Sequence, residues 1–223
     1  MDPGGNVLGG SLEASVLSCA TDRFTFIHIP KNAGTSIRHT LRGVDFDQER
    51  IRRGMERDPA YANHYPIWFI EQEFGLPDLP TVMVVRNPWE RMVSLYNHRM
   101  RKLDMSFEGK PRNTEEDKKV ARQGFVPWLL TTPSRGDSTL TRTAQATWGK
   151  DVDGHYVIHH VLRFEDLEAD WRHLCEHFNM PHYPLPHVLK GKDTSYREHY
   201  TPEADAHIRE YFAEDIERYG YEI

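Results

Sequence analysis

The sequence predicts an α/β fold, a largely parallel sheet flanked by helices in three layers. Three apolar segments rich in β-branched residues are typical of buried strands: 24–29, 81–86 and 156–164. Each is followed, after a short turn, by a segment with apolar residues at helical spacing. Strands that alternate with helices favour parallel pairing, because a parallel connection needs a crossover long enough to hold a helix.

The first strand and helix enclose a turn that could hold an anion. The stretch FTFIHIPKNAGTS runs from the strand at 24–29 into Pro30 and Gly34, and then into helical spacing from Thr35 onward. The first N–H groups of a helix lack partners and carry partial positive charge, and Lys31 adds a full charge. The turn is therefore either a phosphate or sulfate cradle, or an ordinary turn in which Gly relieves strain and hydroxyls cap the helix.

Lys31 does not fit a nucleoside-triphosphate loop. The pattern of those loops is G-x-x-x-x-G-K-[ST], whereas here the lysine precedes the only glycine of the turn, Gly34. The sequence therefore disfavours an ordinary ATPase or GTPase.

The second strand also ends in a residue suited to an anion. Arg86 closes the strand at 81–86, and Ser94 follows eight positions later on the expected helix. Ligands of parallel α/β sheets bind beyond the carboxyl ends of the strands, so Lys31 and Arg86 are expected to lie close together. The guanidinium fork of Arg86 suits a phosphate, and Ser94 could bond the same group. The alternative for Arg86 is an ion pair with a nearby carboxylate.

The remaining elements complete the expected single domain over 23–223, after a flexible lead-in at 1–22. The charge-dense segment 101–122 is predicted to be a mobile insertion, and a candidate lid. Further helices are expected at 67–74, 87–100, 124–132, 164–180 and 201–221, the last with Thr201 as its N-cap.

Composition and charge argue against several classes of partner and site. The 223 residues carry a formal net charge of -6, which argues against nucleic acids and anionic membranes as partners. The two cysteines cannot make a disulfide framework, and no apolar run has the length of a membrane span. We therefore expect a cytoplasmic protein that binds no membrane. The chain has no H-E-x-x-H or paired C-x-x-C, so no metal is expected.

Three blocks of the sequence together resemble the sulfotransferase family. IPKNAGTS looks like the 5′-phosphosulfate loop of that family, and VVRNPWERMVSLYNH looks like its 3′-phosphate motif. The segments LRFEDLEADWRHLCEHF, KDTSYREHYTPE and DIERYGY resemble the C-terminal part of the carbohydrate-type members, related to heparan sulfate 2-O-sulfotransferase and to bacterial proteins. The resemblance implies a P-loop, nucleotide-kinase-like fold and 3′-phosphoadenosine 5′-phosphosulfate as the sulfuryl donor, without a metal.

The resemblance also implies the residues of the nucleotide site. Arg86 and Ser94 would hold the 3′-phosphate, and Tyr196 and Arg197 are weaker candidates for closing over the nucleotide. The residues that would wrap the 5′-phosphosulfate are Lys31, Asn32, Ala33, Gly34, Thr35 and Ser36.

Sulfuryl transfer to a hydroxyl also requires a base. Lys31 would neutralise charge on the leaving phosphate, and a positioned His or Glu would take the proton of the acceptor. The resemblance favours His64, before the second helix, as catalytic base and acceptor contact. The rival bases are His28, His159, His160 and Glu90. Thr143 and Gln145 are tentative acceptor contacts, since relatives often carry a substrate-facing glutamine there.

The sequence thus predicts a sulfotransferase that acts on a carbohydrate or small-metabolite acceptor. Two alternatives remain: a nucleotide kinase-like phosphoryl transferase on the same architecture, and a non-catalytic nucleotide-binding module. The kinase would need a lysine after the glycines and Mg²⁺ ligands, neither of which is visible.

Overall fold

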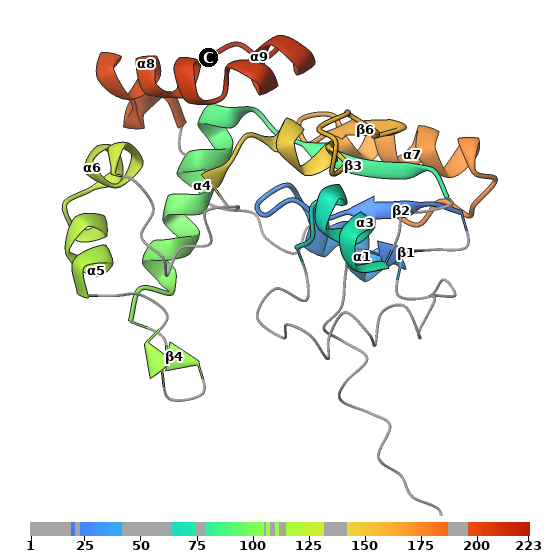
Figure 1. The fold of residues 1–223 in the computed structure, drawn as a ribbon, viewed down its shortest axis with the longest axis horizontal. Helices are drawn as coiled ribbons and strands as arrows, with labels where there is room; N and C mark the ends of the chain where they lie inside the picture. Colours follow the sequence, from blue (N-terminus) through green and yellow to red (C-terminus); the bar gives the residue numbers. More distant parts are fainter. Residues whose placement is uncertain are drawn as a thin grey trace, which may run out of the picture.

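The described part of the computed structural model contains a four-stranded sheet, which lies on one side of the long helix α4 (Pro88–Arg101) (Figure 1). The structure describes residues 19–20, 23–41, 64–74, 79–104, 106–107, 110–111, 115–131, 142–186 and 196–223. The strands are β1 (Cys19–Ala20), β2 (Thr25–Ile27), β3 (Thr81–Val85) and β6 (His160–Arg163), in that spatial order. β2, β3 and β6 pair in parallel, whereas the short β1 is antiparallel to β2.

Both faces of the sheet are covered by helices, as a three-layer fold requires. Val82 and Val84 belong to the core on one face, with side chains from α1 (Gly34–Leu41) and α7 (Leu167–His177). Met83 and Val85 belong to the core on the other face, with α3 (Ile67–Phe74) and α4 (Pro88–Arg101). The side chains of alternate β3 residues thus enter opposite cores, so every residue of the strand is buried. The predicted fold class is confirmed.

The long helix α4 begins with a well-formed N-cap. The side-chain oxygen of Asn87 accepts N–H bonds from Trp89 at 3.0 Å and Glu90 at 3.4 Å, and Pro88 occupies the first turn. The helix crosses the middle of the molecule, with the sheet on one side and α5 and α6 on the other (Figure 1).

The C-terminal segment folds as two helices, so the prediction of one helix at 201–221 was wrong. The helices α8 (Pro202–Tyr211) and α9 (Ala213–Tyr219) meet at Phe212. The ring of Phe212 is buried in the core, and its backbone caps α8 while it opens α9. Core packing of one aromatic ring therefore sets the break, and no proline or glycine marks it.

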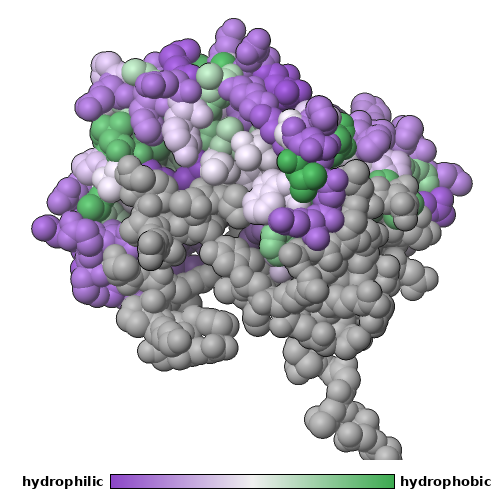
Figure 2. Space-filling model, viewed as in Figure 1, coloured by the Kyte–Doolittle hydropathy of each residue, from purple (hydrophilic) through white to green (hydrophobic). Residues whose placement is uncertain are grey.

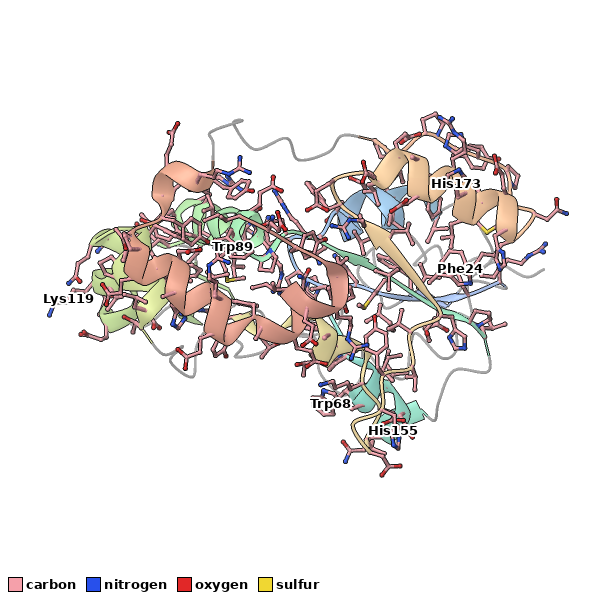
Figure 3. All side chains as sticks on the ribbon, turned by 90° about the horizontal axis from the view of Figure 1, so that it is seen from above. Phe24, Trp68, Trp89, Lys119, His155 and His173 are labelled. Carbon is pink, nitrogen blue, oxygen red and sulfur yellow. The ribbon has the colours of Figure 1, made fainter. Side chains whose placement is uncertain are left out.

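The C-terminal helices are bonded to α4 and to the carboxyl ends of two strands. The indole N–H of Trp89, which is labelled beside the C-terminal helices in Figure 3, donates to Asp205 at 2.8 Å. Beyond α9, the Asn87 side chain donates to the carbonyl of Glu222 at 2.8 Å, and Arg163 donates to the carbonyl of Tyr219 at 2.6 Å. The outer faces of these helices are largely hydrophilic (Figure 2).

The third strand is shorter than the predicted segment 156–164. Only His160–Arg163 pairs with β3 as a strand. The residues just before β6 are held instead by hydrogen bonds to Thr81 that involve side chains. The Thr81 hydroxyl donates to the carbonyl of Val157 at 2.6 Å, and the Thr81 N–H donates to His159 Nδ1 at 3.1 Å.

The charge-dense segment 101–122 contains regular structure that the sequence analysis did not predict. A hairpin of β4 (Ser106–Phe107) and β5 (Lys110–Pro111) precedes α5 (Glu115–Arg122). α5 has three acidic residues in its first turn and basic residues in its last, the order that the helix dipole favours. It packs beside α6 (Phe125–Leu130), which lies inside the helix predicted at 124–132. The role of segment 101–122 as a lid stays a prediction.

The other helices predicted at 67–74, 87–100 and 164–180 are confirmed with small shifts at their ends. Two short 3₁₀ helices are added: η2 (Gln145–Gly149) and η3 (Tyr196–His199). Most of the predicted lead-in at 1–22 lies outside the described residues, and the single-domain organisation stays a prediction.

Candidate functional site

The carboxyl ends of three parallel strands bring Lys31 and Arg86 together. Lys31 follows β2, Arg86 follows β3 and Phe164 follows β6. The Arg86 guanidinium donates to the carbonyl of Lys31 at 3.0 Å, and its central carbon lies 3.9 Å from the centre of the Phe164 ring. The two cations expected at one edge of the sheet are therefore in contact through the backbone of one of them.

Loop 30–36 holds two non-glycine residues in left-handed backbone conformations. Lys31 has a φ of 72° and Ala33 a φ of 56°, a region that side chains other than glycine rarely adopt. The N–H groups of Ser36 and Ile37 both donate to the carbonyl of Ala33, at 2.8 and 3.3 Å, and so start α1. The N–H groups just before Ser36 precede this first turn and have no helical acceptor, so they suit an anion.

Gly34 is required by space. A Cβ at this position would overlap the imidazole of His28, which is buried beneath the loop. The φ of Gly34 is not in the left-handed region, so the missing side chain, rather than backbone freedom, is what the loop uses.

Lys31 is a half-buried cation among other cations. Burial, together with the positive charges of Arg101, Arg86 and Lys102, lowers the pKa of its ammonium group to about 8. A bound polyanion would relieve this repulsion. The electrostatics of the loop therefore favour a ligand with several negative charges.

Arg86 has one ion-pair partner and one spare donor. One terminal nitrogen donates to Glu90 at 2.8 Å, which is the ion pair that the sequence analysis left open for this residue. Its Nε is buried and has no hydrogen-bond partner among the described residues. Ser94 lies one turn beyond Glu90 on α4, so these two residues lie on one face of the helix that follows Arg86.

His64 is oriented by a backbone carbonyl. Its Nδ1 lies 2.9 Å from the carbonyl oxygen of His28, and its ring centre lies 4.2 Å from that of His28. A carbonyl can only accept, so Nδ1 carries the hydrogen and Nε2 of the neutral ring keeps its lone pair. This is the tautomer that a general base at Nε2 requires.

The rival bases have other bonds or positions. His159 Nδ1 accepts the Thr81 N–H, and His160 packs against His177 and Phe178. His159 and His160 therefore contribute to local structure at the start of β6.

The weaker site candidates lie around α4 and η2. Tyr196 and Arg197 form part of η3, which packs on α4, and the Arg197 guanidinium stacks over the Tyr196 ring. Thr143 accepts the indole N–H of Trp148 with its hydroxyl at 3.2 Å. Their contacts with nucleotide or acceptor stay predictions.

Gln145 and Asn32 are buried, in contrast to the exposed contacts that the sequence analysis expected. Gln145 is 0% exposed and Asn32 1% exposed. The Asn32 amide donates to the Gln145 side-chain oxygen at 2.6 Å and to the carbonyl of Val84 at 2.7 Å. Neither side chain can reach a ligand in this conformation, so we drop Gln145 as an acceptor contact.

Two buried charges near loop 30–36 were missed by the sequence analysis. Arg91 is 0% exposed and donates to the carbonyls of Pro30 at 3.3 Å and Thr143 at 3.0 Å. Asp215, also 0% exposed, accepts the N–H groups of Gln145 and Ala146. The signal in the sequence was the position of Arg91, a charged residue on a helix face that is otherwise apolar and includes Met92 and Leu95.

The described residues contain no group of three or more His, Cys, Asp or Glu side chains that could hold a metal ion. None of the helices described is both long and apolar enough to cross a membrane.

Comparisons with known proteins show the family of this chain. A search of curated proteins found no match. The family model of the sulfotransferase family matches residues 15–222, which include all the strands and helices described. The members of that family transfer a sulfuryl group from 3′-phosphoadenosine 5′-phosphosulfate. With a match over nearly its whole length and cations at the strand ends that suit such a donor, the chain belongs to the sulfotransferase family.

Proposed function

We propose that this sulfotransferase acts on a hydroxyl of a carbohydrate or small metabolite, with loop 30–36 and Arg86 holding the nucleotide and His64 serving as the base. The observation that carries the proposal is the convergence of Lys31 and Arg86 at the carboxyl ends of adjacent parallel strands.

The residues present fit a nucleotide with two separated anionic groups. Lys31 and the free N–H groups at the start of α1 suit the 5′-phosphosulfate. Arg86, with its unpartnered buried Nε, and Ser94 suit the 3′-phosphate. When that phosphate binds, Glu90 would have to give up its hydrogen bond to the Arg86 guanidinium, because the carboxylate and the phosphate would compete for the same N–H donors.

In the transfer itself, the bound donor supplies the sulfuryl group and its nucleoside phosphate departs. Nε2 of His64 accepts the proton of the acceptor hydroxyl as that oxygen forms its bond to sulfur, while His28 holds Nδ1 in place. The Lys31 ammonium stabilises the charge that grows on the leaving phosphate oxygen. Glu90 is less suited as the base, since its carboxylate is engaged in the ion pair with Arg86.

The first experiment measures donor binding. Isothermal calorimetry with 3′-phosphoadenosine 5′-phosphate should show binding to the wild-type protein, and Lys31→Ala and Arg86→Ala should each weaken it by about tenfold or more, because each removes a charge-assisted contact. A folded wild-type sample with no affinity for this nucleotide would contradict the proposal.

The second experiment tests the base. A screen of carbohydrate and metabolite acceptors with labelled donor, read by mass spectrometry, identifies a substrate for kinetics. His64→Asn keeps an N–H that can donate to His28 but removes Nε2, so kcat should fall by about 10² to 10⁴ while nucleotide binding persists.

The matched control is His173→Ala, which alters an exposed histidine on α7 and should leave kcat unchanged (Figure 3). Normal turnover by His64→Asn would show that another group is the base. A protein that binds the nucleotide but sulfates nothing in the screen would favour the non-catalytic module.

A further inference from the structure

A buried amide connects the two loops that carry Lys31 and Arg86, and a buried carboxylate fixes that amide. We propose that Gln145 and Asp215 are positioning residues, which set the distance and orientation between loop 30–36 and Arg86. The inference rests on the proposed function and assigns to that site two residues that do not touch the nucleotide.

Gln145 bonds to Arg86 as a neighbouring strand would. Its side-chain oxygen accepts the Arg86 N–H at 2.9 Å, and its side-chain nitrogen donates to the Arg86 carbonyl at 2.8 Å. β3 ends at Val85, so Arg86 is the first residue after the strand. The amide therefore continues the hydrogen-bond pattern of the sheet by one residue and fixes the backbone from which the guanidinium extends.

The same amide holds loop 30–36. The Gln145 oxygen also accepts the Asn32 side-chain N–H at 2.6 Å, and that nitrogen donates to the carbonyl of Val84 as well. Asn32 lies between Lys31 and Ala33, the two residues with left-handed backbone. Rotating the Asn32 amide would place its oxygen against two other oxygens, so the bonds allow one orientation only.

Asp215 fixes Gln145 from α9. One oxygen of the carboxylate accepts both the backbone N–H of Gln145 at 2.7 Å and its side-chain N–H at 3.1 Å. The other oxygen accepts the N–H of Ala146 at 2.8 Å. Burial raises the pKa of Asp215, but these N–H bonds and the buried Arg91 favour its charged form. The carboxylate thus holds the start of η2 at a fixed position.

The hydrogen bonds of Gln145 are complete, which makes it a rigid link. Its oxygen accepts two bonds and its nitrogen donates two, the full capacity of an amide. In a buried network of this kind, removal of one member leaves the others unsatisfied, and they move to find new partners. Here the members that would move are Asn32 and Arg86, at the centre of the nucleotide site.

The test separates positioning from general stability by using three variants. Gln145→Met keeps the volume of the side chain and removes all four bonds. Asp215→Asn keeps the shape and places an N–H group against N–H donors. Thr81→Val is the control, because it removes, at the opposite end of β3, a buried hydroxyl that donates to the carbonyl of Val157 and accepts the N–H of His159. Each variant is examined by thermal unfolding, by calorimetry with 3′-phosphoadenosine 5′-phosphate, and by steady-state kinetics for donor and acceptor.

All three variants should lower the melting temperature, but only two should affect the nucleotide. Gln145→Met and Asp215→Asn should weaken nucleotide affinity and raise the donor KM by about 10 to 100-fold, with the acceptor KM changed by less than about twofold. Thr81→Val should keep the wild-type affinity. If Gln145→Met does not fold, Asp215→Asn gives the same comparison.

Wild-type nucleotide affinity in folded Gln145→Met and Asp215→Asn would overturn the inference and leave the proposed function intact. A wild-type protein that does not bind the nucleotide would overturn both.

Discussion

At the scale of single residues, loop 30–36 uses its glycine for space and its other residues for backbone shape. Gly34 makes room for the His28 imidazole, and His28 in turn orients His64 with its carbonyl. One histidine thus lies between the loop and the proposed base. Gly34 is therefore needed because it has no side chain, and not because its backbone adopts a conformation that other residues avoid.

The first prediction concerns this contact. Gly34→Ala should lower the free energy of unfolding by about 1 to 3 kcal/mol, because the new methyl group overlaps the His28 ring. Urea denaturation measures the change. In the double variant Gly34→Ala/His28→Ala the overlap is gone, so the alanine at 34 should cost much less there. Equal costs in both backgrounds would show that the ring is not what Gly34 accommodates.

The second prediction concerns the charge of Lys31. Its pKa of about 8 should rise when an anion binds, so nucleotide affinity should be highest below about pH 8 and fall as the pH rises above it. Calorimetry from about pH 6.5 to about pH 9.5 measures the profile.

Lys31→Met should bind weakly and lack the fall near pH 8, since no ammonium is left to titrate. The sign for stability is opposite to that for binding: a lowered lysine pKa means that the folded protein without nucleotide gains stability as the pH rises from about 8 towards the ordinary lysine value. An affinity that did not change across this range would contradict the assignment.

Residue roles could be predicted from sequence where position along a strand determines them. Lys31 and Arg86 follow apolar strands, and parallel pairing places both at one edge. The role of Gln145 could not be predicted in this way, because its partner Asp215 is 70 positions away in the sequence and its burial depends on α9. A polar residue in a polar segment looks exposed until the tertiary structure covers it.

At the scale of elements, α4 and α8 begin in the same way and differ in what else their caps bind. Each has Pro at the first position after an Asn or Thr N-cap. Among the described contacts, the Thr201 side chain accepts only the Ala204 N–H, at 3.3 Å. The Asn87 side chain accepts two N–H groups and also donates to the carbonyl of Glu222.

The third prediction compares the two caps. Thr201→Ala should lower the free energy of unfolding by about 1 kcal/mol, the usual cost of a lost N-cap. Asn87→Ala should lower it by about 2 kcal/mol or more, because a buried tertiary bond is lost as well. Urea denaturation of both variants tests the order, and a larger effect at Thr201 would contradict it.

Helices with clear start signals could be predicted well, and elements set by distant packing could not. α4 has a cap, a proline and an apolar face within its own sequence. The break at Phe212 has no local signal, and neither does the replacement of strand pairing by Thr81 bonds before His160. α5 was not predicted because the dense charge of segment 101–122 is typical of a surface insertion, although the order of charges in α5 favours a helix.

At the scale of the whole molecule, the sheet separates two cores with different tasks. The core on the side of α1 and α7 contains Trp171 and Leu174, and Phe24 lies beside α7 in Figure 3. The core on the other side contains Trp89 and supports α4, α8 and η2, which surround the proposed site. Changes within α7 should therefore be tolerated without loss of function, provided that the fold persists.

The fourth prediction tests this division. Leu174→Ala should lower the free energy of unfolding by about 2 to 5 kcal/mol, because it leaves a cavity in a buried cluster. Nucleotide affinity, measured by calorimetry well below the melting temperature, should equal that of the wild type. A large loss of affinity in folded Leu174→Ala would show that the two faces are coupled.

The bond from Asn87 to Glu222 joins residues 135 positions apart, and it has a consequence for biosynthesis. A ribosome delivers the N-terminal part first, so Lys31 and Arg86 emerge long before Asp215 and Glu222. Until the segment 215–222 has left the exit tunnel and docked, the residues next to both cations lack the partners that order them. Nascent chains should therefore acquire nucleotide-binding competence late, as one of the last events of folding.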